Sequence, residues 1–340
     1  MTYKTIIQKL LDRQDLGRAE SEGIMEEIMG GKLTPAQIGS FLAALSAKGE
    51  TEEEITGFAT VMREKCTKVS VDFPVFDTCG TGGSGLPKVN VSTMAAFILA
   101  AGGVRVAKHG SRSNTGRSGS MDVLEKMGIR IDLGPRKVEE LLESQGLGFM
   151  FAPLYHPAMA HVAPVRREIG FRTVFNFLGP LANPAGATRQ VLGVSNVSRA
   201  PLMIQALKEL GSERALVMVG SDGLDEITLT GPTRFWELRE GKIFESLFEP
   251  ESIGLKTVSF EAITGGDPER NAELCATILS GSSEKEFEAL RVFTLLNAAA
   301  GFWMAEKTPD IGSGYRLAED LLSSGEAWRK VESYREESQK

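Results

Sequence analysis

The sequence has few residues that bind soft metals or form disulfides. In 340 residues there are three cysteines and three histidines, without a CxxC or HxxxH pattern: Cys66, Cys79, Cys275, His109, His156 and His161. An odd number of widely separated cysteines is typical of free thiols in a reducing cytoplasm. The pattern gives no support for a zinc site, and a hard cation held by oxygen atoms remains open.

The chain also lacks a long apolar run and a positive net charge. No apolar run approaches 18 residues without a charge or a glycine, and the first 16 residues alternate charged and apolar positions at helical spacing. We therefore expect neither a membrane span nor a signal peptide. The formal net charge of −7 argues against binding to nucleic acid or to a membrane surface, since both need a basic face.

Residues 1–70 predict a small helical domain. Capping boxes at Thr34–Gln37 and Thr51–Glu54 begin two helices, and Gly49 ends the first of them. Two earlier helices are indicated by apolar stripes, which consist of Ile6, Leu10 and Leu11 and of Ile24, Ile28 and Met29. Helical patterns recur over His156–Glu168 and Arg172–Leu178, so we expect helices from about residues 156–185 to join this domain.

Residues 71–340 predict an α/β domain. Short β-branched runs alternate with glycine-rich turns and helical patterns such as Thr93–Ala101, which indicates a sheet with helices on its faces. The expected strands are Val75-Phe76, Val104–Ala107, Gly148–Ala152, Gln190–Val194 and Leu216–Val219, followed by a hairpin of Arg234–Leu238 and Lys242–Phe244.

Two motifs that suit phosphate follow the first of these strands. Asp77–Gly85 has four glycines in nine residues, which lets backbone N–H groups converge on an anion. It is neither a Walker loop nor a dinucleotide fingerprint. The sequence NVST at Asn90–Thr93 begins an apolar helix, whose N-terminus attracts phosphate. We expect Ser92 or Thr93 to cap this helix, and the Ser92 hydroxyl could also bind a metal.

A polar loop and a carboxylate pair follow later strands. Lys108–Ser120 holds three cations among glycines and hydroxyls, which suits a lid that closes on a polyphosphate. Lys108 is the best candidate for neutralising a leaving pyrophosphate. Asp225 and Glu226 precede an apparent strand, Ile227–Leu229, where two like charges need a counterion. Magnesium bound to phosphates fits, because it takes few carboxylates.

The segment His156–Glu168 combines packing residues with two arginines. Met159, Val162 and Val165 would line one face of a helix. Arg166 and Arg167 are then candidates for bidentate recognition of a carboxylate, although exposed arginines are also ordinary helix residues.

Together these motifs resemble the anthranilate phosphoribosyltransferase family over nearly the whole chain. The resemblance rests on the order and spacing of DTCGTGGSG, NVST, KHGSR…SGS…DVLE, HPAM…VRREIGFRTVFNFLGPLANP and GLDE. It implies the nucleoside-phosphorylase-like phosphoribosyltransferase fold, with a small helical domain and a large α/β domain whose central, mostly parallel sheet is flanked by helices. It also implies a cytoplasmic homodimer formed through the helical domains. The implied reaction, in tryptophan biosynthesis, uses Mg2+ and moves phosphoribosyl from 5-phosphoribosyl 1-diphosphate (PRPP) to the amine of anthranilate, releasing pyrophosphate.

The resemblance also implies residue roles, with Lys108 as the catalytic residue. The residues implied to bind PRPP are Gly80, Gly83, Ser84, Asn90, Val91, Ser92, Thr93, Lys108, Gly110 and Ser120. Those implied to bind anthranilate are Gly80, His109, Ser111, His156 and Arg166. Ser92, Asp225 and Glu226 are the implied magnesium ligands.

The chain departs from the family pattern at several positions. Ser84 stands where the family usually has Asp, Ser111 where it has Asn, and Lys88 where it has Thr, and Ser113–Arg117 differ as well. Three alternatives therefore stay open: a paralogue with another aromatic acceptor, a pyrimidine-nucleoside-phosphorylase-like enzyme, for which Arg112 and Ser113-Asn114 argue, and a non-catalytic ligand-binding relative.

Overall fold

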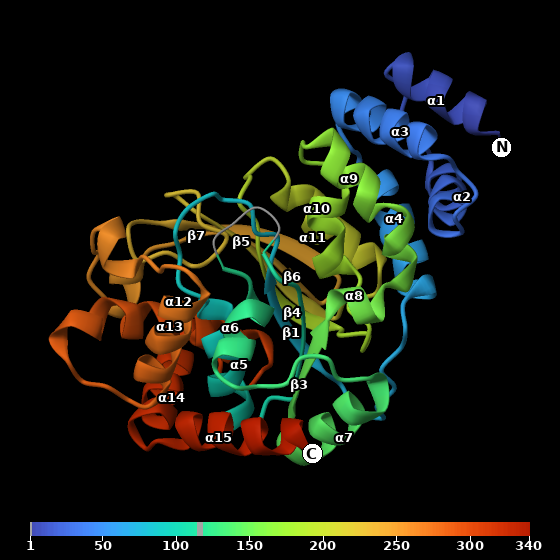
Figure 1. The fold of residues 1–340 in the computed structure, drawn as a ribbon. Coiled ribbons are helices and arrows are strands. Elements are labelled where there is room, and N and C mark those ends of the chain that lie inside the picture. The colour runs from blue at the N-terminus through green and yellow to red at the C-terminus, as the bar shows by residue number, and fades with distance from the viewer. Residues whose placement is uncertain (1, 114–117) are drawn as a thin grey trace.

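The computed structural model describes residues 2–113 and 118–340. Four N-terminal helices lie at one end of the molecule, and a sheet surrounded by helices forms the rest (Figure 1). The helices of the N-terminal half are α1 (Tyr3–Leu11), α2 (Arg18–Met29), α3 (Pro35–Lys48), α4 (Glu52–Lys65), α5 (Val91–Ala101), α6 (Ser120–Lys126), α7 (Pro135–Gln145), α8 (Ala152–Tyr155) and α9 (Ala163–Ile169). Those that follow are α10 (Phe175–Leu178), α11 (Ala200–Glu209), α12 (Pro268–Leu279), α13 (Glu288–Met304), α14 (Ile311–Ser323) and α15 (Glu326–Gln339). Within the described residues, none of these helices is both long and apolar enough to span a membrane.

One seven-stranded sheet organises the α/β part, in the order β3-β2-β1-β4-β5-β6-β7. The first five strands pair in parallel and the last two are antiparallel. The strands are β1 (Phe76–Gly80), β2 (Val106–Gly110), β3 (Leu147–Phe151), β4 (Arg189–Gly193), β5 (Arg214–Gly220), β6 (Thr233–Arg239) and β7 (Lys242–Phe248). All five predicted parallel strands and the hairpin are confirmed, with boundaries moved by a few residues.

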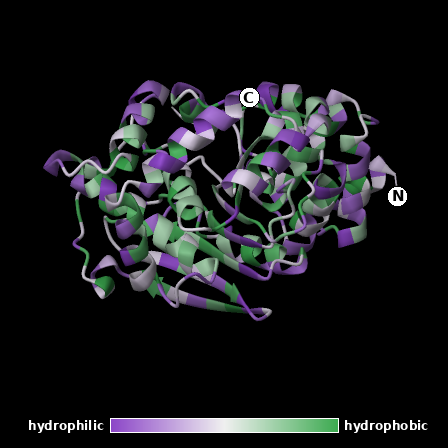
Figure 2. Cartoon of the chain, turned by 90° about the horizontal axis from the view of Figure 1, so that it is seen from below, coloured by the Kyte–Doolittle hydropathy of each residue, from purple (hydrophilic) through white to green (hydrophobic). Residues whose placement is uncertain are grey.

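The two faces of the sheet contribute to two separate cores. Along β5, Leu216 and Met218 point to a core shared with α5 and α12–α15, whereas Ala215, Val217 and Val219 point to one shared with α11 and the N-terminal helices. This alternation follows from the two-residue repeat of a strand. Figure 2 shows hydrophobic residues along the sheet and the helices beside it, and hydrophilic residues on the outer helices.

The N-terminal helices begin as their capping boxes predict. The Thr34 hydroxyl accepts from Gln37 N, and that of Thr51 accepts from Glu54 N, at 3.3 and 3.4 Å. One position of the predicted stripes is wrong. Leu11 is 64% exposed, because α1 ends at this residue and only Ile6 and Leu10 face the core.

The segment between β3 and β4 packs on the N-terminal helices. Val165 of α9 lies beside α3, where a Cβ at Gly39 would be 3.6 Å from its Cγ1. The prediction of one helix over His156–Glu168 is wrong, since a 3₁₀ turn at Pro157–His161 precedes α9. The second predicted helix shortens to α10.

The order of strands creates a switch point at β1. The chain runs from β1 to β2 and β3 on one side, then returns to the other side as β4 and β5. In such sheets, ligands bind beyond the carboxyl ends of the strands where the order reverses. The glycine-rich loop after β1 and the chain after β4 therefore meet at the expected binding edge.

Candidate active site

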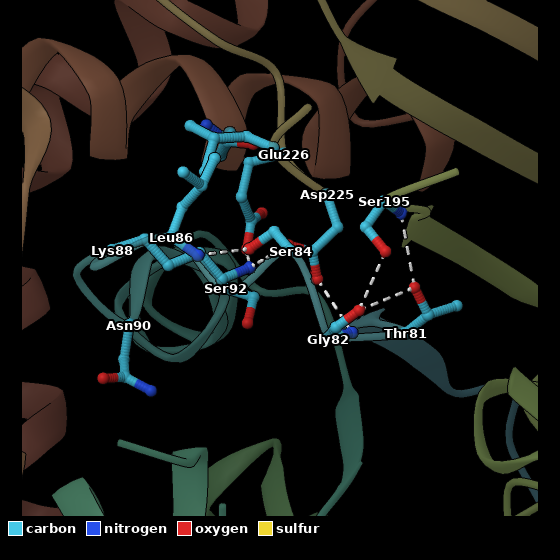
Figure 3. Close-up of polar contacts among 12 residues, drawn as sticks. Thr81, Gly82, Ser84, Leu86, Lys88, Asn90, Ser92, Ser195, Asp225 and Glu226 are labelled. Carbon is cyan, nitrogen blue, oxygen red and sulfur yellow. Dashed lines mark hydrogen bonds and ion pairs between the residues drawn. The ribbon is translucent and has the colours of Figure 1, made fainter. Parts of the chain in front are cut away.

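The glycine-rich motif is partly strand and partly loop. Asp77–Gly80 belong to β1, so the loop proper begins at Thr81. Its backbone is tied to β4 and the chain after it, because Thr81 N donates to Gly193 O at 2.9 Å. The Ser195 hydroxyl also donates to Gly82 O at 3.0 Å (Figure 3). These bonds hold the loop over the switch point.

Asp225 lies against the ends of β1 and β4. Its Oδ2 accepts from Gly82 N at 2.9 Å. A Cβ at Gly80 would lie 2.5 Å from this same oxygen, and a Cβ at Gly193 would overlap the Asp225 carbonyl oxygen. Only glycine at both strand ends admits this approach, so the two glycines position the carboxylate at the site.

The residues after Glu226 do not form the predicted strand. Ile227–Leu229 are buried, but they lie outside the sheet. Their backbone is held by α13, where Asn297 Oδ1 accepts from Ile227 N at 3.0 Å and its Nδ2 donates to Ile227 O at 3.0 Å. The apolar run reflects burial against a helix, which residue type alone does not separate from burial in a sheet.

A lysine binds both carboxylates of the predicted metal site. Lys88 Nζ lies 2.6 Å from Asp225 Oδ1 and 2.8 Å from Glu226 Oε1 (Figure 3). Burial alone would raise the pKa of Asp225, but Lys88 and the Gly82 amide hold it below its usual value. Burial and the neighbouring Asp225 raise the pKa of Glu226 despite Lys88. Burial would lower the pKa of Lys88, yet the two carboxylates raise it. Asp225 and Glu226 therefore form a cation-binding site, and the cation they hold in this structure is the ammonium group of Lys88.

The start of α5 differs from its prediction. The helix begins at Val91 with Asn90 as the N-cap residue, so neither Ser92 nor Thr93 caps it. The Thr93 hydroxyl is buried and has no hydrogen-bond partner among the described residues. The N–H groups of Val91 and Thr93 bond to backbone carbonyls. Within the described residues, the N–H of Ser92 has no protein acceptor, so it is available to an anion.

Lys108 lies beneath the site on β2. It is only 2% exposed, and its Nζ donates to Thr78 O and, at 3.2 Å, to the Ser92 hydroxyl. Burial lowers its pKa although Asp77 opposes this, and burial raises the pKa of Asp77 to about 6 against the effect of Lys108. In this conformation Lys108 contacts the start of α5 through the Ser92 hydroxyl.

The second polar loop begins at the end of β2. Gly110 lies so close to the Ser120 hydroxyl that a Cβ would overlap it, and Met121 N donates to Ser111 O at 3.4 Å. Arg112 pairs outward with Glu125, at 2.7 Å. The predicted positions Asn114 and Arg117 lie outside the described residues.

Two histidines form a buried pair at the carboxyl end of β2. The rings of His109 and His156 are 4.9 Å apart, and His109 Nδ1 lies 3.3 Å from Gly179 O. Burial, reinforced by His156, lowers the pKa of His109 to about 3, and burial lowers that of His156 to about 4. Both rings are therefore neutral at pH 7. The Nε2 atom of each is buried without a hydrogen-bond partner within the described residues.

Arg166 extends from α9 with no acidic partner in the described part of the chain. Its guanidinium carbon lies 5.8 Å from the centre of the Phe175 ring, and burial lowers its pKa. A partly buried guanidinium of this kind is suited to a planar carboxylate.

Comparison with known proteins covers both parts of the chain. The helical bundle domain of a glycosyl transferase family matches residues 4–66, and its a/b domain matches residues 72–328. The anthranilate phosphoribosyltransferase of Chloroflexus aggregans is 47% identical over 97% of each chain. The chain belongs to the anthranilate phosphoribosyltransferase family.

Solved structures of this family have the same fold. The Thermus thermophilus enzyme aligns with a TM-score of 0.91 at 42% identity, covering 98% of this chain and 99% of its own. The enzyme of Saccharomyces cerevisiae, in complex with PRPP and Mg, aligns with a TM-score of 0.90 at 26% identity, covering 99% and 98%. In complex with 4-fluoroanthranilate, the yeast enzyme aligns with a TM-score of 0.88, also at 26% identity, covering 99% of each chain.

The contacts join several pairs of the predicted site residues of this family, but not all of these residues. They link Gly80 to Asp225, Ser92 to Lys108, Gly110 to Ser120 and His109 to His156. Gly83 is exposed in the loop, and the Ser84 hydroxyl accepts from Leu86 N at 3.4 Å. Val91 is fully buried, and its N–H donates to Val89 O at 2.8 Å. Within the described residues, Arg166 makes no hydrogen bond to the others.

Several residues that shape the site are absent from the sequence predictions. Asn271 Nδ2 donates to Lys88 O and to Asn90 Oδ1, at 3.2 and 2.8 Å. Arg172 Nη1 donates to Gly83 O at 3.0 Å, and Ser195 holds Gly82. Of these, only Arg172 had a signal, because it follows the two predicted arginines in the same conspicuous segment.

Proposed function

We propose that this chain transfers the phosphoribosyl group of PRPP to the amine of anthranilate and releases pyrophosphate. One observation supports it above the others: the glycine loop, the start of α5 and the Asp225–Glu226 pair converge at the switch point of the sheet. In the reaction, the bond from the anomeric carbon to the diphosphate breaks and a bond to nitrogen forms, and the amine loses one proton.

The phosphate side is proposed to bind PRPP through backbone and hydroxyl groups. Gly80 and Gly83 would contribute backbone groups to the diphosphate site, because Gly80 admits the Asp225 carboxylate and Gly83 admits the Arg172 guanidinium beside the loop. The Ser92 N–H at the start of α5 has no acceptor within the described residues. The other proposed PRPP-binding residues lie at the start of α5 (Asn90 and Thr93), at the end of β2 (Gly110) and at the start of α6 (Ser120). Lys108, through Ser92, adds positive charge below the diphosphate, where a preorganised charge favours departure of the leaving group.

Magnesium fits the carboxylate pair. Asp225 and Glu226 are buried oxygen donors that already hold one cation, Lys88, and magnesium takes few carboxylates beside phosphate and water. Ser92, Asp225 and Glu226 would hold Mg2+, which when bound supplies positive charge beside the diphosphate.

The acceptor side is proposed to bind anthranilate. The Arg166 guanidinium would donate hydrogen bonds to the carboxylate, and the neutral rings of His109 and His156 would lie beside the aromatic ring together with Ser111. The amine of anthranilate is neutral and nucleophilic at pH 7, so orientation contributes more than a strong base.

Pyrophosphate release from PRPP tests the proposal. We expect release with magnesium only when anthranilate is present, and a phosphoribosyl anthranilate product. Release that requires a different aromatic acid would indicate a paralogue. Phosphorolysis of a pyrimidine nucleoside would indicate the phosphorylase-like alternative, and binding without turnover the non-catalytic one.

A homodimer formed through the helical domains is also proposed, in the cytoplasm. Its support is the apolar side chain of Leu11 on α1, which is 64% exposed. The three buried free thiols suit a reducing compartment. Light scattering of the purified protein would detect the dimer, and Leu11→Glu should shift it toward monomer.

A further inference from the structure

Lys88 lies where a metal ion would otherwise balance the charge of Asp225 and Glu226. The Asp225 side chain is 0% exposed and that of Glu226 is 4% exposed. Lys88 Nζ contacts one oxygen of each, at 2.6 and 2.8 Å (Figure 3). Two buried carboxylates that lie close together need a counterion. In this chain the ammonium group of Lys88 is that counterion.

The backbone holds Lys88 in place. Its carbonyl accepts from Asn271 Nδ2 at 3.2 Å, and the residue forms an isolated bridge with Thr264. On the same side, Gly265 N donates to Pro87 O at 3.1 Å. These bonds fix the main chain at Lys88, and its side chain extends from there to Asp225 and Glu226.

An ammonium and a divalent ion compete for this carboxylate pair. Asp225 Oδ2 already accepts from Gly82 N at 2.9 Å. Magnesium binds carboxylate oxygens at about 2.0–2.1 Å, so an ion held by both side chains would lie close to the oxygens that Lys88 contacts. Two positive centres would then lie close together in a buried site, where repulsion is weakly screened. Binding of the ion therefore requires that Lys88 move away.

We propose that Lys88 is a resident cation that takes the place of a divalent metal ion at Asp225 and Glu226 in the free enzyme, so that magnesium binds this pair only in competition with Lys88. The inference rests on the proposed function for the identity of the ion. Its test uses the enzyme without PRPP or acceptor, so its outcome is separate from that of the activity assay.

Binding of Mn2+ to the substrate-free protein tests this competition. Titration followed by electron paramagnetic resonance should show little binding to the wild type, and Lys88→Thr should bind roughly 10-fold tighter or more, since removing the ammonium leaves an uncompensated charge pair. Glu226→Gln in the Lys88→Thr background should abolish the gained site. Lys88→Arg, which keeps the charge, should resemble the wild type.

Thermal unfolding supplies a second readout. Lys88→Thr should melt at a lower temperature than the wild type without metal, and Mn2+ should restore it because a ligand of the native state stabilises by mass action. The matched control is Lys65→Thr. It removes an exposed ion pair with Glu26, 2.7 Å long, in the helical domain, and should change neither readout.

Two results would overturn the inference. One is tight Mn2+ binding by the wild type that Glu226→Gln removes, a measurement that does not depend on whether Lys88→Thr folds. The other is a folded Lys88→Thr protein with no gain in Mn2+ affinity.

Discussion

The proposed phosphate side and the proposed acceptor side of the site differ in how their charges are partnered. On the phosphate side, Lys88 is bound to Asp225 and Glu226, and Lys108 lies beside Asp77. On the acceptor side, within the described residues, Arg166 has no acidic partner, and neither His109 Nε2 nor His156 Nε2 has a hydrogen bond.

This difference has an energetic consequence. A ligand on the phosphate side must exchange existing partners, so its net gain is the difference between two sets of interactions. A ligand on the acceptor side bonds groups that have no protein partner among the described residues, so it displaces water and no protein partner. Substitutions on the two sides should therefore affect different kinetic constants.

The largest expected effect is that of Gly193→Ala on the phosphate side. The new Cβ would overlap the Asp225 carbonyl, so the carboxylate must move. A misplacement of about 1 Å can cost roughly 100-fold in turnover, and we expect at least that in a pyrophosphate-release assay. Overpacking should also cost about 1–3 kcal/mol of stability.

The control for this change is Gly23→Ala within α2, where a Cβ meets nothing within 4 Å. It should leave turnover unchanged and stabilise the helix by at most about 1 kcal/mol. Wild-type turnover in Gly193→Ala would contradict the positioning role of this close contact.

Arg166→Ala should produce the next largest effect, on the acceptor side. Loss of a charge-assisted bond costs about 1.5–3 kcal/mol, which is roughly a 10- to 100-fold rise in KM for anthranilate. The KM for PRPP should stay the same. Arg167→Ala, an exposed neighbour on the same helix, is the control. An unchanged anthranilate KM in Arg166→Ala would refute the assignment.

Asn271→Ala should raise the KM for PRPP and not that for anthranilate, the reverse of Arg166→Ala, and the effect should be smaller. Asn271 is fully buried and bonds Lys88 O, Asn90 Oδ1 and Gly266 N. An unsatisfied buried group costs about 1–3 kcal/mol, so we expect the KM for PRPP to rise about 10-fold and that for anthranilate to change little. Glu273→Ala, on the exposed side of α12, should alter neither. If the KM for PRPP and the KM for anthranilate rose equally, Asn271 would not act on the phosphate side alone.

Local patterns predicted much of this architecture. Capping boxes depend on residues a few positions apart, so Thr34 and Thr51 were recognised correctly. The glycine-rich loop was recognised in part, because its first four residues belong to β1. Asp225 and Glu226 were recognised as a pair that needs a counterion. The N-cap residue of α5 was predicted wrongly. Asn90 takes this position, and the Ser92 hydroxyl accepts from Lys108 instead.

Partners distant in the sequence account for what was missed. Lys88 and Asp225 are separated by 137 positions, and Asn271 and Asn90 by 181. No periodicity relates residues so far apart, so only the fold brings them together. Lys88 stood out in the sequence only as a departure from the family pattern, and its charge had no visible partner until the carboxylates were placed beside it.

The smallest effect at neutral pH concerns the two unprotonated histidines of the acceptor side. The pKa of His109 is lowered to about 3 and that of His156 to about 4, both by burial, whereas unfolded histidine titrates near 6.5. Below pH 6.5 the unfolded chain therefore binds protons that the native chain does not. As the pH is lowered from 6.5 to 4, the free energy of unfolding should therefore decrease by at most about 1.4 kcal/mol per pH unit for each ring.

Asp77 opposes this trend, because its pKa is raised to about 6 and the native state holds the extra proton between about pH 4 and 6. In the wild type the histidines should outweigh it. In His109→Gln/His156→Gln the slope between pH 4 and 6 should vanish or reverse, as measured by urea unfolding at a series of pH values. His161→Gln, at an exposed histidine, should keep the wild-type slope. A double variant that also keeps it would show that the acceptor-side rings are protonated in the native state, and the contrast between the two sides would be lost.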